Sequence, residues 1–291
     1  MKTRLLRDAV ALFTVILFVV VVAPIASGQT TFSASGPNPA SIQATVDAFR
    51  ANLGTLNPNV AGSFGSGRRE INWDGVPDAL SAPNNLPANF FNVNSPRGVV
   101  LSTPGSGFQV SATAASGTPV NFGNIDASYT NTFSTFSAQR LFTPIGSNIV
   151  DVNFFVPGST IPALTKGFGS VFSDVDLAGT TSIQFFDLMG ASLGTFFAPN
   201  VAGASQTLSF LGVSFATAIV ARVRITNGNF ALGAGATDQN GITRDVVVMD
   251  DFIYGEPLQA SVPDGAPGMI GLVALAGVLF AGAASRHRAR A

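Results

Sequence analysis

Two pairs of aspartates are the residues of this 291-residue sequence best suited to chemistry. Asp174 and Asp176 are two positions apart, so an extended backbone places both carboxylates on one face. Asp250 and Asp251 are adjacent, on the last apolar segment of the central region. Like charges this close repel unless a cation neutralises them, and Ca²⁺ accepts carboxylate and backbone oxygens as ligands. All four residues are candidate calcium ligands, and solvated strand-end and turn residues are the alternative interpretation.

A second acidic group surrounds the single tryptophan, Trp73. Glu70, Asp74 and Asp78 lie in a segment rich in Gly and Pro. A glycosidase would use two such carboxylates as acid and base, and Trp73 could stack on a sugar ring. However, Asp-Gly at positions 74 and 75 is ordinary turn chemistry, and the arginines just before Glu70 could form local ion pairs. We therefore favour a structural role for this group and expect Trp73 to lie in the core.

The composition excludes several other functions. The chain has no Cys, and its single His, His287, is close to the C-terminus. A disulfide scaffold, a thiol nucleophile, a His-ligated zinc site and a Ser-His-Asp triad in the central region are therefore excluded. The chain has 15 basic and 16 acidic residues and no basic stripe, so we expect no nucleic-acid partner. We predict no catalytic residues and a protein that is not an enzyme.

The N-terminal residues 1–28 have the pattern of a secretory signal peptide. Lys2, Arg4 and Arg7 precede the apolar run Ala9–Ala23, and small residues at positions 26–28 offer a cleavage site. The apolar run is short for a membrane span. We expect cleavage after Gly28; an uncleaved membrane anchor is the alternative.

The C-terminus has a longer apolar segment. Residues 266–284 contain no charge and are long enough to cross a bilayer. Arg286, Arg288 and Arg290 follow directly, and such positive charges stay on the cytoplasmic side of a membrane. The sequence therefore predicts a transmembrane helix over 266–284 and places the central region across the membrane.

This C-terminal pattern resembles that of a known class of sorting signals. Val262-Pro263-Asp264-Gly265, the apolar segment and the terminal Arg cluster resemble the PEP-CTERM tails of bacterial proteins, especially the variants that read Val-Pro-Asp-Ser-Gly. Asp264-Gly265 stands where Glu-Pro is usual, which leaves the sorting-enzyme subtype open. The resemblance implies an exosortase-type membrane enzyme as partner. It also implies export to the cell surface or extracellular space of a Gram-negative bacterium, with transient inner-membrane anchoring and links to biofilm polysaccharide. An ordinary single-span anchor is the alternative.

Residues 29–260 remain as the body, with nine basic and fourteen acidic residues and thus a net charge of −5. Ile42, Val46, Phe49 and Leu53 form one apolar face and predict a helix that Gly54 ends. The rest of 29–97 reads as an irregular segment packed on the body.

Residues 98–260 read as a β-sandwich of jelly-roll type, because short strands follow one another with turn residues between them. The strict alternation in 219–226 predicts a strand with one polar face, and 245–254, apolar on both faces, predicts a central strand. The stretches GFGSVFSDVD, ARVRIT and VVVMDDFIYG resemble exported β-sandwich domains that precede such tails. The expected strands are 98–102, 107–112, 150–156, 182–187, 192–197, 208–215, 219–226 and 245–254.

These observations predict an exported, tail-sorted surface or matrix protein. Its β-sandwich is expected to make structural or glycan contacts without catalysis, although the sequence does not indicate which residues would bind a glycan. The alternative is a secreted polysaccharide-active enzyme that uses carboxylates. The predicted regions are 1–28, 29–97, 98–260 and 261–291.

Overall fold

The computed structural model describes residues 28–238 and 243–260, and over these residues the chain is mainly β. The strands are β1 (Gln29–Gly36), β2 (Arg68–Ile71), β3 (Val99–Ser102), β4 (Gly107–Val110), β5 (Phe142–Ile145), β6 (Ile149–Phe154), β7 (Ala163–Leu164), β8 (Gly167–Ser173), β9 (Ser182–Phe186), β10 (Ser192–Phe197), β11 (Leu208–Phe215), β12 (Arg222–Thr226), β13 (Val248–Gly255) and β14 (Leu258–Gln259). The helices are α1 (Pro39–Leu53), α2 (Phe90–Val93) and α3 (Tyr129–Thr132), with 3-10 turns at Asp78–Leu80 and Ala114–Ser116.

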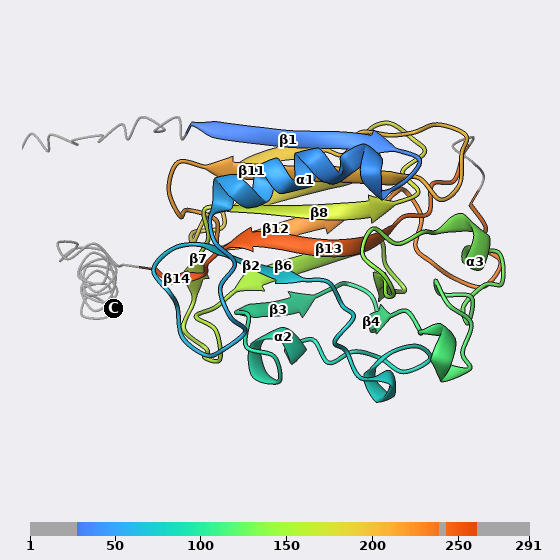
Figure 1. Ribbon diagram of the computed structural model, residues 1–291, viewed down its shortest axis with the longest axis horizontal. Coiled ribbons are helices and arrows are strands. Elements are labelled where there is room, and N and C mark those ends of the chain that lie inside the picture. The colour runs from blue at the N-terminus through green and yellow to red at the C-terminus, as the bar shows by residue number, and fades with distance from the viewer. Residues whose placement is uncertain (1–27, 239–242, 261–291) are drawn as a thin grey trace, which may run out of the picture.

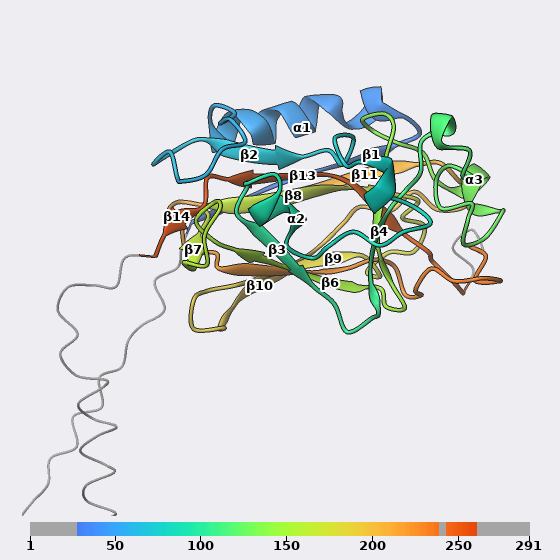
Figure 2. The same cartoon turned by 90° about the horizontal axis from the view of Figure 1, so that it is seen from below.

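Two antiparallel sheets lie face to face, in the arrangement of a β-sandwich (Figures 1 and 2). The large sheet has seven strands in the order β1-β11-β8-β13-β5-β4, and β2 also pairs with β13. The small sheet has five strands in the order β10-β9-β12-β6-β3, and β14 pairs with β7 in a separate two-stranded ladder. The main core fills the space between the sheets.

The small sheet is buried on one face only. Its strands β6, β9 and β12 alternate between buried and partly exposed residues. In β12, Val223 and Ile225 are buried in the core, whereas Arg222 and Arg224 point outward. The predicted alternation is therefore confirmed for Arg222–Thr226, whereas residues 219–221 precede the strand and Ala221 is partly exposed. The small sheet presents a polar outer surface.

The large sheet is covered on both faces because α1 packs on its outer side (Figure 2). All residues of β8, β11 and β13 are buried. The central position predicted for the last strand is confirmed, since β13 pairs with β8 on one side and with β5 and β2 on the other. The sequence of a strand that is covered on both faces is typically a near-continuous apolar run instead of an alternation of polar and apolar residues.

The helix α1 forms where the apolar spacing predicted it. Asn38 caps its first turn by accepting a hydrogen bond from the Ser41 N–H, and Pro39 occupies the first turn, where it loses no helical hydrogen bond. Its four apolar side chains are buried against Val171, Leu208, Phe210 and Ile253 of the large sheet. The predicted residues Ile42, Val46, Phe49 and Leu53 thus form the helix–sheet interface.

Two opposed glycines make room for this interface. Gly169 on β8 and Gly212 on β11 are register partners, and the Phe49 ring lies over both. A Cβ on Gly212 would lie 2.9 Å from Cδ2 of Phe49, closer than side chains tolerate. The absence of side chains at these two positions therefore fixes how closely α1 approaches the sheet.

We expect Gly212→Ala to destabilise the fold by about 1–3 kcal/mol, the usual cost of overpacking a filled core. The added methyl group must displace Phe49 or shift α1. Urea denaturation measures the loss. Gly75→Ala is the matched control, because nothing lies within 4 Å of the added carbon there. Equal stability of both variants would contradict this account of the packing.

The segment 29–97 differs from the irregular segment that the sequence predicts. It supplies two strands of the large sheet: β1 pairs with β11 along its whole length, and β2 pairs with β13. Both were missed for a physical reason. As an edge strand, β1 turns only Phe32 and Ala34 toward α1 and is otherwise Ser, Thr, Gln and Gly, while β2 has four residues, two of them arginines.

Both ends of the body lie at the same end of the sandwich (Figures 1 and 2). Both ends lie close to Lys166. At the N-terminal end, Gln29 pairs with Phe215, and the Phe215 N–H donates to the carbonyl of Lys166. At the C-terminal end, β14 pairs with β7, which ends just before Lys166. The predicted signal peptide 1–28, apart from Gly28, and the predicted tail 261–291 with its proposed sorting motif and apolar segment lie outside the described residues. Within 28–238 and 243–260, no helix has the length and apolarity to span a bilayer.

Candidate functional site

Three aspartates meet where β8 ends. The chain leaves β8 at Asp174 with a positive φ of 71°, and the Asp174 N–H donates to the carbonyl of Thr207 beside it. Asp176 follows two residues later, and Asp238 comes from the connection between β12 and β13. One carboxylate oxygen from each of Asp174, Asp176 and Asp238 lies within 4.8 Å of the others. We call these three residues the acidic cluster.

A fourth aspartate holds the surrounding backbone. The carboxylate of Asp245 accepts hydrogen bonds from the N–H groups of Asp176 at 3.1 Å and Leu177 at 3.4 Å, and from the Thr180 hydroxyl. The Asp245 N–H donates to Asn229. Both Asp245 oxygens are therefore occupied by bonds that fix the chain around the acidic cluster.

Asp174 and Asp176 lack such partners. Their side chains are buried, and none of their four carboxylate oxygens has a described partner within normal hydrogen-bond geometry. Burial raises the pKa of Asp174 to about 9, with a further contribution from the charges of Asp176, Asp238 and Asp245. Burial and the charges of Asp238 and Asp245 raise the pKa of Asp176 to about 7. The charged groups that raise the pKa values of Asp174 and Asp176 are all aspartates, so negative charge is concentrated here.

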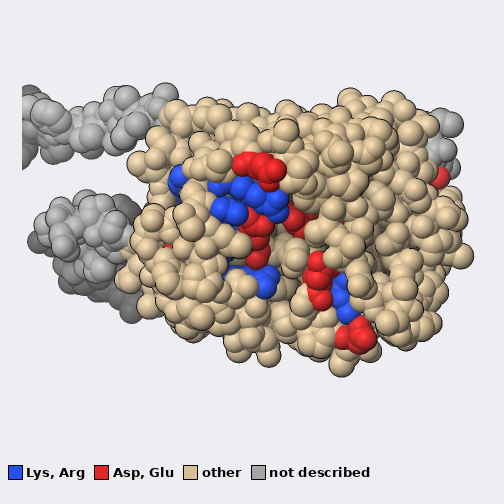
Figure 3. Space-filling view, viewed as in Figure 1, with Lys and Arg blue, Asp and Glu red and all other residues tan. Residues whose placement is uncertain are grey.

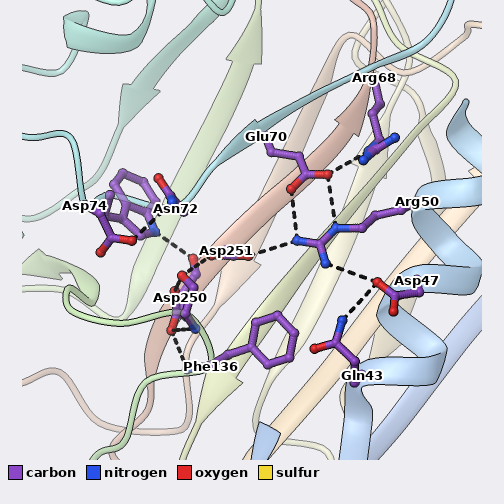
Figure 4. A network of polar contacts seen from close by, with 12 residues as sticks. Gln43, Asp47, Arg50, Arg68, Glu70, Asn72, Asp74, Phe136, Asp250 and Asp251 are labelled. Carbon is purple, nitrogen blue, oxygen red and sulfur yellow. Dashed lines mark hydrogen bonds and ion pairs between the residues drawn. The ribbon is translucent and has the colours of Figure 1, made fainter. Parts of the chain in front are cut away.

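The structure places the second aspartate pair in a different network (Figure 4). Asp250 accepts hydrogen bonds from the backbone N–H of Phe136 at 2.6 Å and from Ser137, and Asp251 accepts from the Ser137 hydroxyl at 2.8 Å. Asp251 also contacts Arg50 at 3.3 Å. Asp250 and Asp251 are not part of the acidic cluster. The four predicted calcium candidates therefore separate into two groups, and Asp238, which the sequence did not single out, joins the first.

Arg50 ties α1 to the large sheet through this network (Figure 4). Its guanidinium binds both oxygens of Glu70 at 3.0 and 2.9 Å, and Arg68 donates to Glu70 at 2.6 Å. Arg50 also pairs with Asp47 on the helix surface. Figure 3 shows charged side chains gathered in the middle of this face and a second, smaller charged group to the lower right, with mostly uncharged residues around them. Glu70 thus links two elements electrostatically.

The remaining carboxylates considered for glycosidase chemistry are also engaged in local bonds. Asp74 accepts from the backbone N–H groups of Gln139 at 2.6 Å and Arg140 at 3.1 Å, and Asp78 accepts from the Arg140 guanidinium. Trp73 is fully buried, stacks on Phe142 with ring centroids 4.1 Å apart, and donates to the Asp250 carbonyl. Its predicted position in the core is confirmed.

The outer face of the small sheet is a site that the sequence did not assign. We define this outer face by eight of the residues that point away from the core, namely Ser102, Asp151, Asn153, Gln184, Phe186, Thr195, Arg222 and Arg224. Figure 2 shows the small sheet as the outermost layer on this side, with no described helix over it. The polar positions of the 219–226 alternation were the one sequence signal for it.

The strand register aligns these residues in two rows across the sheet. The first row runs from Ser102 through Asp151, Arg224 and Gln184 to Thr195. The second row places Arg222 between Asn153 and Phe186. Cross-strand neighbours of this kind contact one another, so the rows form continuous strips of polar groups.

Contacts within the rows hold the long side chains flat. Asp151 accepts from both Arg222 at 2.9 Å and Arg224 at 2.8 Å, the latter through two parallel hydrogen bonds. The Arg222 guanidinium lies 3.7 Å from the centroid of the Phe186 ring. A guanidinium stacked on an aromatic ring is planar and preorganised, so the outer face offers donors and acceptors in fixed positions.

No protein-family model matches the chain, and no curated protein is significantly similar to it.

Proposed function

We propose that this chain is an exported protein of the cell surface or extracellular matrix of a Gram-negative bacterium. Residues 1–28 direct export, and an exosortase-type enzyme sorts the chain through Val262–Gly265, the apolar segment 266–284 and the terminal arginines. The shared position of the two body ends supports this proposal. The ends of the body that lead to the proposed export and sorting signals leave the sandwich at one end, so neither has to pass over a sheet to reach a membrane.

We further propose that the body is a jelly-roll-like sandwich that contacts extracellular polysaccharide without catalysis. The observation that carries this proposal is the outer face, an uncovered sheet surface with two rows of fixed polar side chains. A polysaccharide presents hydroxyl groups at regular spacing, each both donor and acceptor. Amide, guanidinium and carboxylate groups such as those of Gln184, Arg224 and Asp151 complement them.

The stacked pair of Arg222 and Phe186 adds an apolar patch to the rows. Sugar rings have apolar C–H faces, which pack on flat π surfaces and guanidinium planes. Exposed polar rows alone would remain hydrated, so the patch supplies the surface whose burial favours binding.

We expect Arg222→Ala combined with Gln184→Ala to weaken binding of the full-length chain to its polysaccharide at least about tenfold, equal to roughly 1.4 kcal/mol. A glycan array followed by affinity electrophoresis measures the change. Arg244→Ala is the matched control, because Arg244 stacks on Phe230 at 4.3 Å outside the outer face. Binding that the double variant retains in full would refute the assignment.

The enzyme alternative has a separate test. A reducing-sugar assay on the same glycans should show no turnover by the wild-type chain. Turnover that Glu70→Gln abolishes would support the carboxylate-dependent enzyme instead. Mass spectrometry of the exported protein tests the sorting proposal, since a C-terminus that still contains Arg288 and Arg290 would argue for an ordinary anchor.

A further inference from the structure

The carboxylates of Asp174 and Asp176 are buried without the partners that would compensate their charge. Both side chains are at most 1% exposed, and none of their oxygens has a described partner within normal hydrogen-bond geometry. The backbone N–H groups of Gln206 and Ala204 and the carboxyl of Asp238 interact with them only outside that geometry. Burying an ionised carboxylate without a partner costs a large amount of free energy. Buried charges in folded proteins are therefore paired or bind metals. The nearest titratable groups add negative charge, because they are Asp238 and Asp245.

An uncharged hydroxyl beside the acidic cluster, that of Thr207, also lacks a hydrogen-bond partner. Thr207 lies opposite Asp174 on the neighbouring strand edge and accepts the hydrogen bond of its N–H. The Thr207 hydroxyl is buried, and it too has no hydrogen-bond partner among the described residues. Buried side-chain oxygens without partners are rare and call for an explanation, such as a bound ion or water. Here they come from two segments that meet at one place.

We propose that Asp174, Asp176 and Asp238 bind one Ca²⁺ ion. The separation of their oxygens fits a single ion. Two ligands on opposite sides of Ca²⁺, each about 2.3–2.6 Å away, are separated by on the order of 5 Å, and the three carboxylates lie within 4.8 Å of one another. Backbone carbonyls and water complete the six to eight oxygen ligands that this ion takes.

The chemistry of the site selects calcium among the common metals. The described chain has neither Cys nor His, so the nitrogen and sulfur ligands that favour zinc and copper are missing from it. Mg²⁺ demands near-ideal octahedral geometry and keeps several waters, whereas three carboxylates at a buried strand end displace most of them. Asp245 is already bonded to backbone N–H groups and a hydroxyl, so we do not count it among the ligands.

The ion would join two segments that are far apart in the sequence. Asp174 and Asp176 follow β8, and Asp238 belongs to the connection from Asn227 to Val247 between β12 and β13. Without a cation, Asp174 and Asp176 either keep their protons or, once ionised, repel Asp238 and the connection that carries it. With one, the repulsion becomes a cross-link. This site does not depend on the polysaccharide proposal, because none of its residues belongs to the outer face.

Isothermal titration of the full-length chain, purified in mild detergent and stripped with EDTA, tests the proposal with CaCl₂ alone. We expect one ion per chain and a higher Tm with calcium than with EDTA. Asp174→Asn should abolish this binding and the calcium-dependent rise in Tm. Asp47→Asn is the matched control, because it removes an exposed aspartate on α1 that is not part of the acidic cluster.

A second readout covers the case in which Asp174→Asn folds poorly. Trypsin cleavage after Arg244, in the connection that the ion holds, should slow at least about tenfold when calcium is added to wild type, and Asp176→Asn should lose this protection. The proposal is overturned if wild type shows neither heat nor a Tm shift with CaCl₂. It is also overturned if both Asn variants bind calcium like wild type.

Discussion

Glu256→Gln should lower the free energy of unfolding by about 3–5 kcal/mol, the cost of leaving one member of a buried ion pair without its partner. Arg69 and Glu256 are almost fully buried, and their paired contacts are 2.7 and 2.8 Å long. Glu256 also accepts hydrogen bonds from Asn57 and Phe64. Gln keeps the shape but removes the charge, so the Arg69 guanidinium stays buried without its counter-charge.

Urea denaturation of the two chains measures this loss. The double variant Arg69→Met with Glu256→Leu should recover much of it, because apolar residues of similar volume often replace a buried pair without penalty. Asp47→Asn provides the comparison, since its ion pair with Arg50 is exposed and should be worth only about 0–1 kcal/mol. A loss for Glu256→Gln as small as that of Asp47→Asn would mean that the pair is hydrated.

The second large effect is a fall in the stability of the calcium-free protein as pH rises. The pKa of Asp174 is raised to about 9 and that of Asp176 to about 7 in the fold, from an ordinary 3.8. Burial also raises the pKa values of Asp245, Asp250 and Asp251. Between roughly pH 4 and pH 9 the folded chain therefore holds protons that the unfolded chain has released, and the free energy of unfolding decreases as pH increases.

Chemical denaturation in EDTA at several pH values checks this slope. We expect a loss of several kcal/mol across the range, which is fully developed once the pH exceeds the folded pKa of Asp174. Asp174→Asn removes the largest contributor and should flatten the curve and make the calcium-free chain more stable than wild type at high pH. A stability that rises with pH would show that these carboxylates are ionised and solvated in the fold.

Local sequence patterns predicted the parts of the fold that local patterns determine. The spacing of Ile42, Val46, Phe49 and Leu53 depends only on helical periodicity, and α1 buries all four. The alternation in β12 likewise follows from one buried face. The sequence did not predict the strand β1, because β1 is an edge strand beneath a helix. It pairs with β11, about 180 positions later, and this pairing is not evident from the composition of β1 itself.

In the candidate calcium site, too, the sequence predicted what lies close along the chain but not what the fold brings together. Asp174 and Asp176 share a neighbourhood because they are close in sequence, as predicted. Asp250 and Asp251 were grouped with them by chemistry alone, but the register shift between Met249 and Phe252 in β13 turns them toward Ser137 and Arg50. Asp238 reaches the cluster through the long connection before β13, and only the three-dimensional arrangement shows this.

The shared exit of both ends of the described body also determines how the sandwich would carry a mechanical load applied through the proposed tail. A tether attached after Ala260 pulls on β14, whose short ladder with β7 can peel open one bond at a time. The next element, β13, is held from both sides and runs toward the same exit (Figure 1). Its hydrogen bonds lie across the pulling direction, so they resist together in shear. Glu256 follows β13 directly, which places its buried ion pair with Arg69 where the force enters the large sheet.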